Sequence, residues 1–562
     1  MNLLLLSLLS LILVNTNSYG AADKTSPSEV LFINGNIYPN FYLEAKAARP
    51  QAIVVRDGRI VALGSNEEIL KMKHAQDEVV DLGGHFVMPG FNDAHVHLAA
   101  GGLELLELNL AGVKSLSEME ERIAEYSRTT PGREWLIGRG WDNTLWPGEK
   151  LPTRQDIDAV TGVHPAIFTR VDGHIAVANT AALKAAGIFA KVADPHGGEI
   201  DRDSSGDATG IVRETAKDLV LAKVPKPSLA TRRHAIELAL ADAARWGITS
   251  LQDYSDWEDF LIYEELEKQG KLTVRVSEWL PFNEPLPLLD SHRAHHSEDD
   301  PMLHTAMLKG FMDGSLGSGT AALNAPYSDD AGNKGLPQYE QGTLNKMAVE
   351  RSIAGFQLGF HAIGDAAVQM ALDAFAEVDR DARENHRERD FRFRIEHDQV
   401  IDAKQFDQFR SLGVIASVQP CHLLTDMNWV VERIGPQRAK TSYPWASFLK
   451  HGVTLAFGTD YPVEPINPFR GVYAAVTRKN EAGTKEFFPE QKVTLKQAIT
   501  AYTTGSAYAQ FAEKDKGTLA TGMLADFVVL DRDITKVPPA AILKTKVLRT
   551  VVGGKTVYEA GK

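Results

Sequence analysis

The segment Phe91-Asn92-Asp93-Ala94-His95-Val96-His97 places two histidines two residues apart, at the end of an apolar run that begins at Phe86. In an extended strand, residues i and i+2 point to the same side, so both imidazoles can reach one ion from one strand. A His-x-His pair also occurs by chance in proteins that bind no metal. The segment therefore predicts a metal site in outline, whose remaining ligands must come from elsewhere in the chain.

Three further residues are candidates for those ligands, because His361, His397 and Asp460 each close a short apolar run. Either histidine alone is more typical of a hydrogen-bonded structural residue. Asp460 alone fits a turn or a helix cap. Together with the His-x-His pair they form a plausible cage for zinc or a similar divalent ion.

The middle of the chain alternates apolar strand candidates with helical stretches, which is typical of βα units and a parallel sheet. One strand ends at His95, and the other candidates are Ile248 to Gln252, Leu272 to Glu278, Met307 to Met312, Gln357 to Phe360, Phe391 to Glu396, Val414 to Val418 and Val453 to Gly458. Eight such units predict an α/β fold of the TIM type, a (β/α)8 barrel. The active site of this fold lies at the carboxyl ends of the strands, where the candidate ligands fall.

Both ends of the chain are rich in β-forming residues. Arg56-Asp57-Gly58-Arg59 and Gly553-Gly554 place Asp and Gly where tight hairpin turns need positive φ. We expect one small β-sandwich domain built from residues 28–88 and 515–562, around a barrel domain of residues 89–514. Two unrelated appendages are the alternative.

A long stretch between His97 and Ile248 does not fit the simple barrel count. It contains patterned segments of its own, such as Glu134 to Gly138 and Pro165 to Arg170. We interpret residues of about 98–247 as an insertion after the first barrel strand, folded over the mouth. Segments of this length at that face usually shape the substrate pocket.

Composition limits the possible classes of function. The chain has 562 residues, of which 44% are hydrophobic and 24% charged, as in soluble globular proteins. The net charge of −14 argues against a nucleic-acid-binding surface. Cys421 is the one cysteine of the sequence, so no internal disulfide can form.

The N-terminus resembles a targeting signal. Leu3 to Val14 is almost entirely apolar, and small residues follow between Ser18 and Ala22. This run is too short to cross a membrane but has the length of a secretory hydrophobic region. We expect residues 1–22 to be a signal peptide and the mature protein to be exported, periplasmic or secreted, without a stable membrane anchor. An uncleaved interfacial anchor is the alternative.

The order His95-x-His97, Lys309, His361, His397 and Asp460, together with Met88-Pro89-Gly90-Phe91, resembles the metal-dependent amidohydrolase superfamily. Further segments are similar to its YtcJ-like branch (amidohydrolase 3), which includes N-substituted formamide deformylases: Asp172-Gly173-His174, Lys309 to Ser318 and His361 to Asp365. The likeness spans the chain from about residue 28 to its end.

The resemblance implies a set of metal ligands. His95 and His97 would bind the more buried ion, with Asp460 close to it, and His361 and His397 the more exposed one. Lys309 stands where related enzymes carry a lysine carboxylated by carbon dioxide, whose carbamate bridges two metals. Some relatives work with one metal, so both one-ion and two-ion sites remain possible.

The resemblance also implies a mechanism. A metal lowers the pKa of bound water from about 15.7 towards about 7, which supplies hydroxide near neutral pH. Asp460 would accept the water's proton and pass it to the departing nitrogen, unless it is a metal ligand only. His174 would donate a hydrogen bond to the substrate carbonyl, unless it is a buried structural histidine.

We therefore expect an exported hydrolase that cleaves a non-peptide carbon–nitrogen bond in a small amide, such as an N-substituted formamide. An esterase or lactonase with the same metal site is a second hypothesis. A non-catalytic regulatory protein that has kept the fold is a third. We expect no nucleic-acid partner, and a homodimer remains possible.

Overall fold

The computed structural model describes residues 29–41, 49–132, 134–171, 173, 175–189, 192–195 and 198–561. The predicted signal peptide, residues 1–22, and His174 lie outside the described residues. Among the helices within those ranges, none has the length and apolar character needed to cross a membrane.

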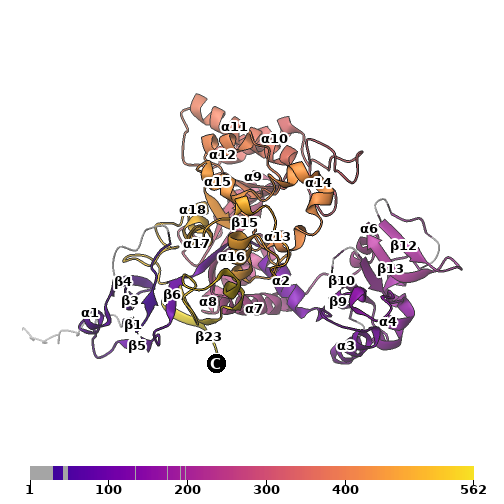
Figure 1. Ribbon diagram of the computed structural model, residues 1–562, viewed down its shortest axis with the longest axis horizontal. Helices are drawn as coiled ribbons and strands as arrows, with labels where there is room; N and C mark the ends of the chain where they lie inside the picture. Colours follow the sequence, from indigo (N-terminus) through magenta and orange to yellow (C-terminus); the bar gives the residue numbers. More distant parts are fainter. Residues whose placement is uncertain are drawn as a thin grey trace, which may run out of the picture.

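Eight parallel strands form a nearly closed barrel in the centre of the molecule (Figure 1). They are β7 (Phe91–Val96), β14 (Ile248–Asp253), β15 (Arg275–Pro281), β16 (Leu303–Phe311), β17 (Gln357–Ala362), β18 (Arg394–His397), β19 (Ile415–Val418) and β20 (Leu455–Phe457). They neighbour one another in chain order, and a parallel bridge between Val96 and Tyr461 links the segment after β20 to β7. All eight predicted strands are present, so the predicted α/β barrel is confirmed.

Helices cover the outside of the barrel, which explains why its strands are apolar on both faces. These helices are α8 (Trp257–Lys268), α9 (Leu286–Arg293), α10 (Gln341–Ile353), α11 (Asp365–Glu384), α12 (Gln405–Leu412), α15 (Trp445–Lys450), α16 (Pro468–Thr477), α17 (Leu495–Thr500) and α18 (Ser506–Ala509). Two others, α13 (His422–Asp426) and α14 (Val430–Ala439), follow β19 at the carboxyl end of the barrel. On α11, Phe375 stacks on Phe360 of β17 and on Phe393, with ring centroids 5.0 and 4.4 Å away. Such contacts fix each helix against the strands that carry the candidate ligands.

The two ends of the chain build two further sheets beside the barrel (Figure 1). One contains β1 (Val30–Ile33), β3 (Ala52–Arg56), β4 (Arg59–Gly64) and β5 (Glu78–Asp81), with α1 (Asn66–Leu70) after β4; the other contains β2 (Asn36–Ile37), β6 (Phe86–Pro89), β21 (Phe527–Leu530), β22 (Val547–Val552) and β23 (Lys555–Glu559). Phe32 of the first sheet packs edge-on against Phe527 of the second, with centroids 4.9 Å apart. The two sheets thus share a hydrophobic cluster, while the β-sandwich arrangement itself stays a prediction.

Turns and close approaches explain how the chain passes between these sheets. Asp57 and Gly58 have φ of 51° and 76°, as the hairpin between β3 and β4 requires. Asn34, with φ of 58°, follows the end of β1 and turns the chain. Residues 30–37 therefore form two strands, β1 and β2, which belong to different sheets. Gly90 separates β6 from β7, and a Cβ at this position would lie 2.2 Å from the Thr249 side chain. Only glycine fits where the chain leaves the small sheet and enters the barrel.

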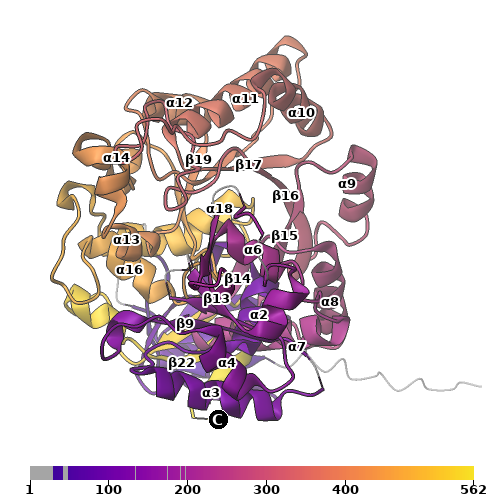
Figure 2. The same cartoon turned by 90° about the vertical axis from the view of Figure 1, so that its right-hand side faces the viewer.

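The insertion after β7 has a fold of its own. Its strands β8 (Leu108–Asn109), β9 (Leu136–Trp141), β10 (Ala166–Arg170), β11 (Ile175–Ala178), β12 (Gly198–Arg202) and β13 (Ala208–Glu214) form one sheet, accompanied by α3 (Leu116–Thr129), α4 (Arg154–Thr161), α5 (Thr180–Ala185) and α6 (Thr215–Leu221). The helices α2 (Leu98–Leu106) and α7 (Leu229–Arg245) flank this sheet in sequence and pack on each other. Figure 2, which views the molecule from the insertion's side, shows β9, β13 and α4 in front of the barrel. The predicted insertion after the first barrel strand is confirmed.

Candidate metal centre

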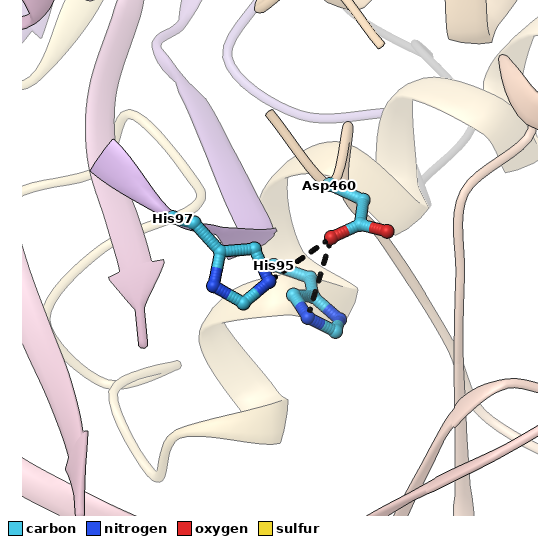
Figure 3. Close-up of side chains that lie close together, drawn as sticks. All are labelled: His95, His97 and Asp460. Carbon is cyan, nitrogen blue, oxygen red and sulfur yellow. Dashed lines mark ion pairs between the residues drawn. The ribbon is translucent and has the colours of Figure 1, made fainter. Parts of the chain in front are cut away.

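Three side chains converge at the carboxyl end of the barrel (Figure 3). His95 is on β7, His97 follows that strand directly, and Asp460 follows β20. Oδ1 of Asp460 lies 3.3 Å from Nε2 of His97 and 3.6 Å from Nε2 of His95. Two imidazole nitrogens and one carboxylate oxygen within this distance form a group that can hold a divalent ion.

A second group shares the same aspartate. His397, at the end of β18, and His422, at the start of α13, lie close enough to Asp460 for the three to hold an ion. Nε2 of His422 is 3.5 Å from Oδ2 of Asp460, so the two carboxylate oxygens face different histidines. Asp460 is therefore the residue on which both groups converge.

Hydrogen bonds anchor one ring nitrogen of each of three candidate histidines. Nδ1 of His95 bonds Oε2 of Glu396 at 2.9 Å, Nδ1 of His97 bonds the carbonyl oxygen of Tyr254 at 2.9 Å, and Nδ1 of His397 bonds Oε1 of Gln419 at 2.8 Å. Each contact uses Nδ1 and leaves Nε2 for another partner. This is the usual arrangement of metal-binding histidines, in which an outer contact fixes the ring orientation.

His361 is anchored through its other ring nitrogen, Nε2. Its Nε2 contacts the carbonyl oxygen of Gly314 at 3.1 Å and lies 3.4 Å from Oδ1 of Asp313. Its ring lies 4.4 Å from that of His397, measured between centroids. Nδ1 is therefore the nitrogen of His361 that is left for a ligand, although His361 belongs to neither of the groups around Asp460.

Lys309, on β16, is buried beside these histidines. Its Nζ lies 2.9 Å from Nε2 of His95 and 5.1 Å from the centroid of the Trp279 ring. Burial lowers the pKa of this amine, Glu396 and Asp460 oppose the shift, and Arg394 adds to it, with a net pKa of about 8. About a tenth of Lys309 is thus an uncharged amine at pH 7.

Asp460 is held as a carboxylate. Burial by itself would raise its pKa, but His95, His97 and the other nearby histidines lower the pKa well below its usual range. Its backbone has φ of 58°, a left-handed conformation that non-glycine residues seldom adopt. Strained backbone of this kind is common where a side chain must be aimed at a functional site.

The donor set fits a divalent cation. Nε2 of His422 is buried without a hydrogen-bond partner, although it lies close to Asp460. An orphaned imidazole nitrogen beside a charged carboxylate is costly unless a ligand or ion completes it. The residues present therefore suit the kind of metal that imidazole and carboxylate ligands prefer.

Two residues of this site are absent from the expectations drawn from sequence. His422 comes four residues after the strand Ile415–Val418, whereas His361 and His397 lie within their strands, so a search limited to strand ends does not find it. Glu396 is fully buried, bonds His95, and pairs with Arg394 at 2.9 Å. A glutamate and an arginine in a strand at the centre of the predicted barrel were the available signal for a buried charged network.

A cavity of about 1330 Å³ opens over the candidate ligands. Its wall includes Arg139, Val171 and Gly173 of the insertion, and Trp429 of the segment before α14. Because these insertion residues line the same cavity as His95 and His97, the insertion contributes to the mouth of the barrel. His174 follows Gly173, but its own position lies outside the described residues.

A (β/α)8 barrel with histidine and aspartate groups at the carboxyl ends of its strands defines a metal-dependent hydrolase of the barrel type. The amidohydrolase family model matches residues 78–558. The chain therefore belongs to the amidohydrolase family, in its YtcJ-like branch, and is an enzyme of that class.

Known relatives extend over almost the whole chain. Protein LONG AFTER FAR-RED 3 of Arabidopsis thaliana is 33% identical, covering 99% of this chain and 97% of the relative. The putative amidohydrolase YtcJ of Bacillus subtilis is 32% identical, with 91% and 96% covered. The N-substituted formamide deformylase of Arthrobacter pascens is 27% identical, with 95% and 99% covered.

A solved structure agrees with this assignment. An uncharacterized metal-dependent hydrolase from Pyrococcus horikoshii superposes with a TM-score of 0.75 at 30% sequence identity. The match covers 91% of this chain and 99% of the archaeal one, so the barrel, the small sheets and the insertion are all part of the likeness.

Proposed function

We propose that this enzyme hydrolyses the carbon–nitrogen bond of a small, non-peptide amide, using one or two zinc ions held by His95, His97, His361, His397 and Asp460. The observation that carries the proposal is the anchoring of the imidazoles. Four histidines, His95, His97, His361 and His397, each bond the protein through one ring nitrogen, which leaves the other nitrogen able to bind an ion.

Lys309 would complete the site as a carbamate. A protonated lysine would repel a divalent cation, whereas a carboxylated one offers two anionic oxygens. Carboxylation requires an uncharged amine, and burial lowers the pKa of Lys309 to about 8. The amine is therefore available to carbon dioxide, and the added carboxylate would replace its short contact with Nε2 of His95.

When bound, the ion would lower the pKa of a water molecule and polarise the carbonyl group of the substrate. Asp460 has one oxygen facing His95 and His97 and the other facing His422. We propose that one of its oxygens accepts the proton of the attacking water and delivers it to the departing nitrogen. The low pKa of Asp460 keeps its carboxylate unprotonated before the reaction.

Two further histidines would act on the substrate side. Nε2 of His422 is buried, unpartnered and close to Oδ2 of Asp460, so it would orient that carboxylate during proton transfer. We also propose that His174, which follows Gly173 at the cavity wall, donates a hydrogen bond to the substrate carbonyl as negative charge develops.

The substrate class rests on the cavity and on one relative. The relative from Arthrobacter pascens is named as an N-substituted formamide deformylase, and a formamide with a bulky N-substituent fits a cavity of about 1330 Å³. We propose N-substituted formamides as the first class to be tested. We further propose that residues 1–22 direct export, which N-terminal sequencing of the mature protein would test.

The decisive experiment combines metal analysis with a substrate screen. Purified protein should contain close to one or two equivalents of zinc and should hydrolyse N-substituted formamides faster than esters of matched shape. Full metal content with turnover of esters alone would overturn the amide assignment and favour an esterase or lactonase. Full metal content with no hydrolysis of either series would overturn the proposed substrate class.

A further inference from the structure

A second cavity, the side pocket, adjoins the metal centre. Its volume is about 490 Å³, and its wall contains residues of α2, the segment after β14, β15 and α9. His97 and Pro462 line both this pocket and the main cavity. A molecule whose reacting carbonyl lies at the metal centre can therefore extend a substituent into the side pocket.

The side pocket carries an excess of negative charge. Five carboxylates line it, contributed by Asp256, Glu258, Asp259, Glu278 and Glu284. Arg232, the one Lys or Arg of the lining, bonds Asp259 and Asp256 at 2.7 Å and so neutralises those two. In the part of the chain that the structure describes, the other three carboxylates form no ion pair.

Glu278 is the carboxylate whose environment is incomplete. Its side chain is 1% exposed, and its Oε1 accepts a hydrogen bond from the backbone of Ser255 at 3.0 Å. Its Oε2 is buried with no hydrogen-bond partner. Asp253 lies close enough to share a proton with Glu278. Two buried carboxylates side by side cost free energy, which indicates that either a proton or a cation belongs at this position.

Two other lining residues, Ser255 and His292, also have buried polar atoms that face no cation among the described residues. The Ser255 side chain lies close enough to Asp253 to lower the pKa of that carboxyl, so its polar group serves the carboxylates of this region. An ammonium group offers three donors and no acceptor, so it suits a pocket lined by carboxylates better than a hydroxyl or a carboxylate does.

A divalent ion and a proton are the other possible occupants. Glu278 belongs to none of the groups of described residues close enough together to hold a metal. Burial and the nearby charge of Asp253 raise the pKa of Glu278 well above its usual range, so without a cation the two carboxylates hold a proton. An organic cation that enters the pocket can replace that proton as the partner of Glu278.

We propose that the side pocket binds a positively charged ammonium group of the substrate, with Glu278 as its counter-ion. This inference rests on the proposed function and narrows its substrate class to small amides whose N-substituent carries a second, basic nitrogen. His97 and Pro462 mark the point where the substituent leaves the metal centre. Glu278 is thus a specificity-determining residue that does not touch the reacting atoms.

The test compares two formamides on the zinc-loaded enzyme. One is N-formyl-4-(aminomethyl)benzylamine, which is cationic at neutral pH, and the other carries a 4-hydroxymethyl group of similar size. We expect the cationic compound to have a kcat/KM at least about tenfold higher, mainly through a lower KM, because a desolvated charge pair favours the matched ligand. Glu278→Gln should remove this preference, and Glu278→Asp, which keeps the charge, should retain part of it.

A matched control and a binding measurement separate this inference from the hydrolase proposal. Glu267→Gln changes a partly buried glutamate of α8 that does not line the pocket, and it should leave the preference intact. Calorimetry should show benzylammonium binding at least about tenfold more tightly than benzyl alcohol, in a manner that requires Glu278. If benzylammonium binds in this way while no formamide is hydrolysed, the proposed ammonium site is supported and the proposed formamide hydrolysis is wrong. If the two formamides react equally and benzylammonium binds no better than benzyl alcohol, the ammonium site is wrong.

Discussion

Nζ of Lys309 lies 2.9 Å from Nε2 of His95, inside the barrel, although 214 residues separate the two in sequence. Both atoms belong to predicted metal ligands, and neither can bind a cation while the amine is protonated and the contact persists. Addition of a carboxylate to Lys309 would resolve this conflict, since it converts a positive group into an anionic ligand.

The first prediction follows from this pair. Lys309→Ala should lower the metal content and remove most turnover, because the bridging carbamate is lost. Propionate should restore part of both by occupying the vacated space as a carboxylate. Metal analysis and rates with and without propionate measure this.

Lys516→Met is the control for Lys309→Ala, since Lys516 is a buried lysine that bonds Ser250 and lies outside the candidate ligands. Normal metal content and turnover in Lys309→Ala would show that the bridging role is wrong.

The second prediction separates proton transfer from metal binding. Asp460→Asn should retain much of the metal, because an amide oxygen still coordinates weakly, while kcat falls by about 10²–10⁴. Zinc content and kcat measured on the same preparation check this. A loss of zinc in proportion to the loss of rate would instead make Asp460 a structural ligand.

The third prediction concerns His422, whose Nε2 lies 3.5 Å from Oδ2 of Asp460. If His422 orients that carboxylate, His422→Gln should reduce turnover by about 10–100-fold with little change in zinc content. His451→Gln is a suitable control, because the ring of His451 stacks on Phe406 away from the metal centre. Loss of one zinc equivalent in His422→Gln would assign His422 as a ligand of a second ion.

The fourth prediction concerns Glu396, which joins Nδ1 of His95 to the buried Arg394. Glu396→Gln should weaken zinc binding by about 10–100-fold, because the ring of His95 loses its anchor. It should also lower the free energy of unfolding by about 3–5 kcal/mol, since the buried charge of Arg394 loses its anionic partner and keeps only neutral ones. Chelator competition and urea unfolding measure the two effects. The double variant Arg394→Met/Glu396→Gln should recover stability but not zinc affinity; recovery of both would argue against the anchoring role.

The fifth prediction concerns the attachment of the small sheets to the barrel. Arg275 of β15 and Asp526, next to β21, form two hydrogen bonds of 2.7 and 2.9 Å, and both side chains are buried. Asp526→Asn should destabilise the protein by about 3–5 kcal/mol, because it leaves Arg275 uncompensated. Glu67→Gln, which breaks the exposed pair with Lys71, should cost less than about 1 kcal/mol. Equal thermal shifts in the two variants would mean that the buried pair does not hold the sheets to the barrel.

Much of the fold could be predicted because its signals are local. Each barrel strand is a short apolar run between polar segments, and an Asp-Gly or Gly-Gly pair marks each of two hairpins; these patterns extend over fewer than about ten residues. In the run 30–37, Asn34-Gly35 is a local signal for a break in the strand. The two halves join different sheets, and that assignment depends on strands far away in the sequence.

The sequence by itself determined the eight-stranded barrel, the insertion after its first strand, and the order of the residues that resemble amidohydrolase ligands. Only the tertiary structure decided which nitrogen of each histidine is anchored, that His422 lies beside Asp460, and that Glu278 faces a second pocket. The physical reason is the range of the interactions. A strand forms from the pattern of its own residues, whereas the orientation of His95 depends on Glu396, which is 301 residues away. Contacts of that kind exist only after the barrel brings its strand ends together.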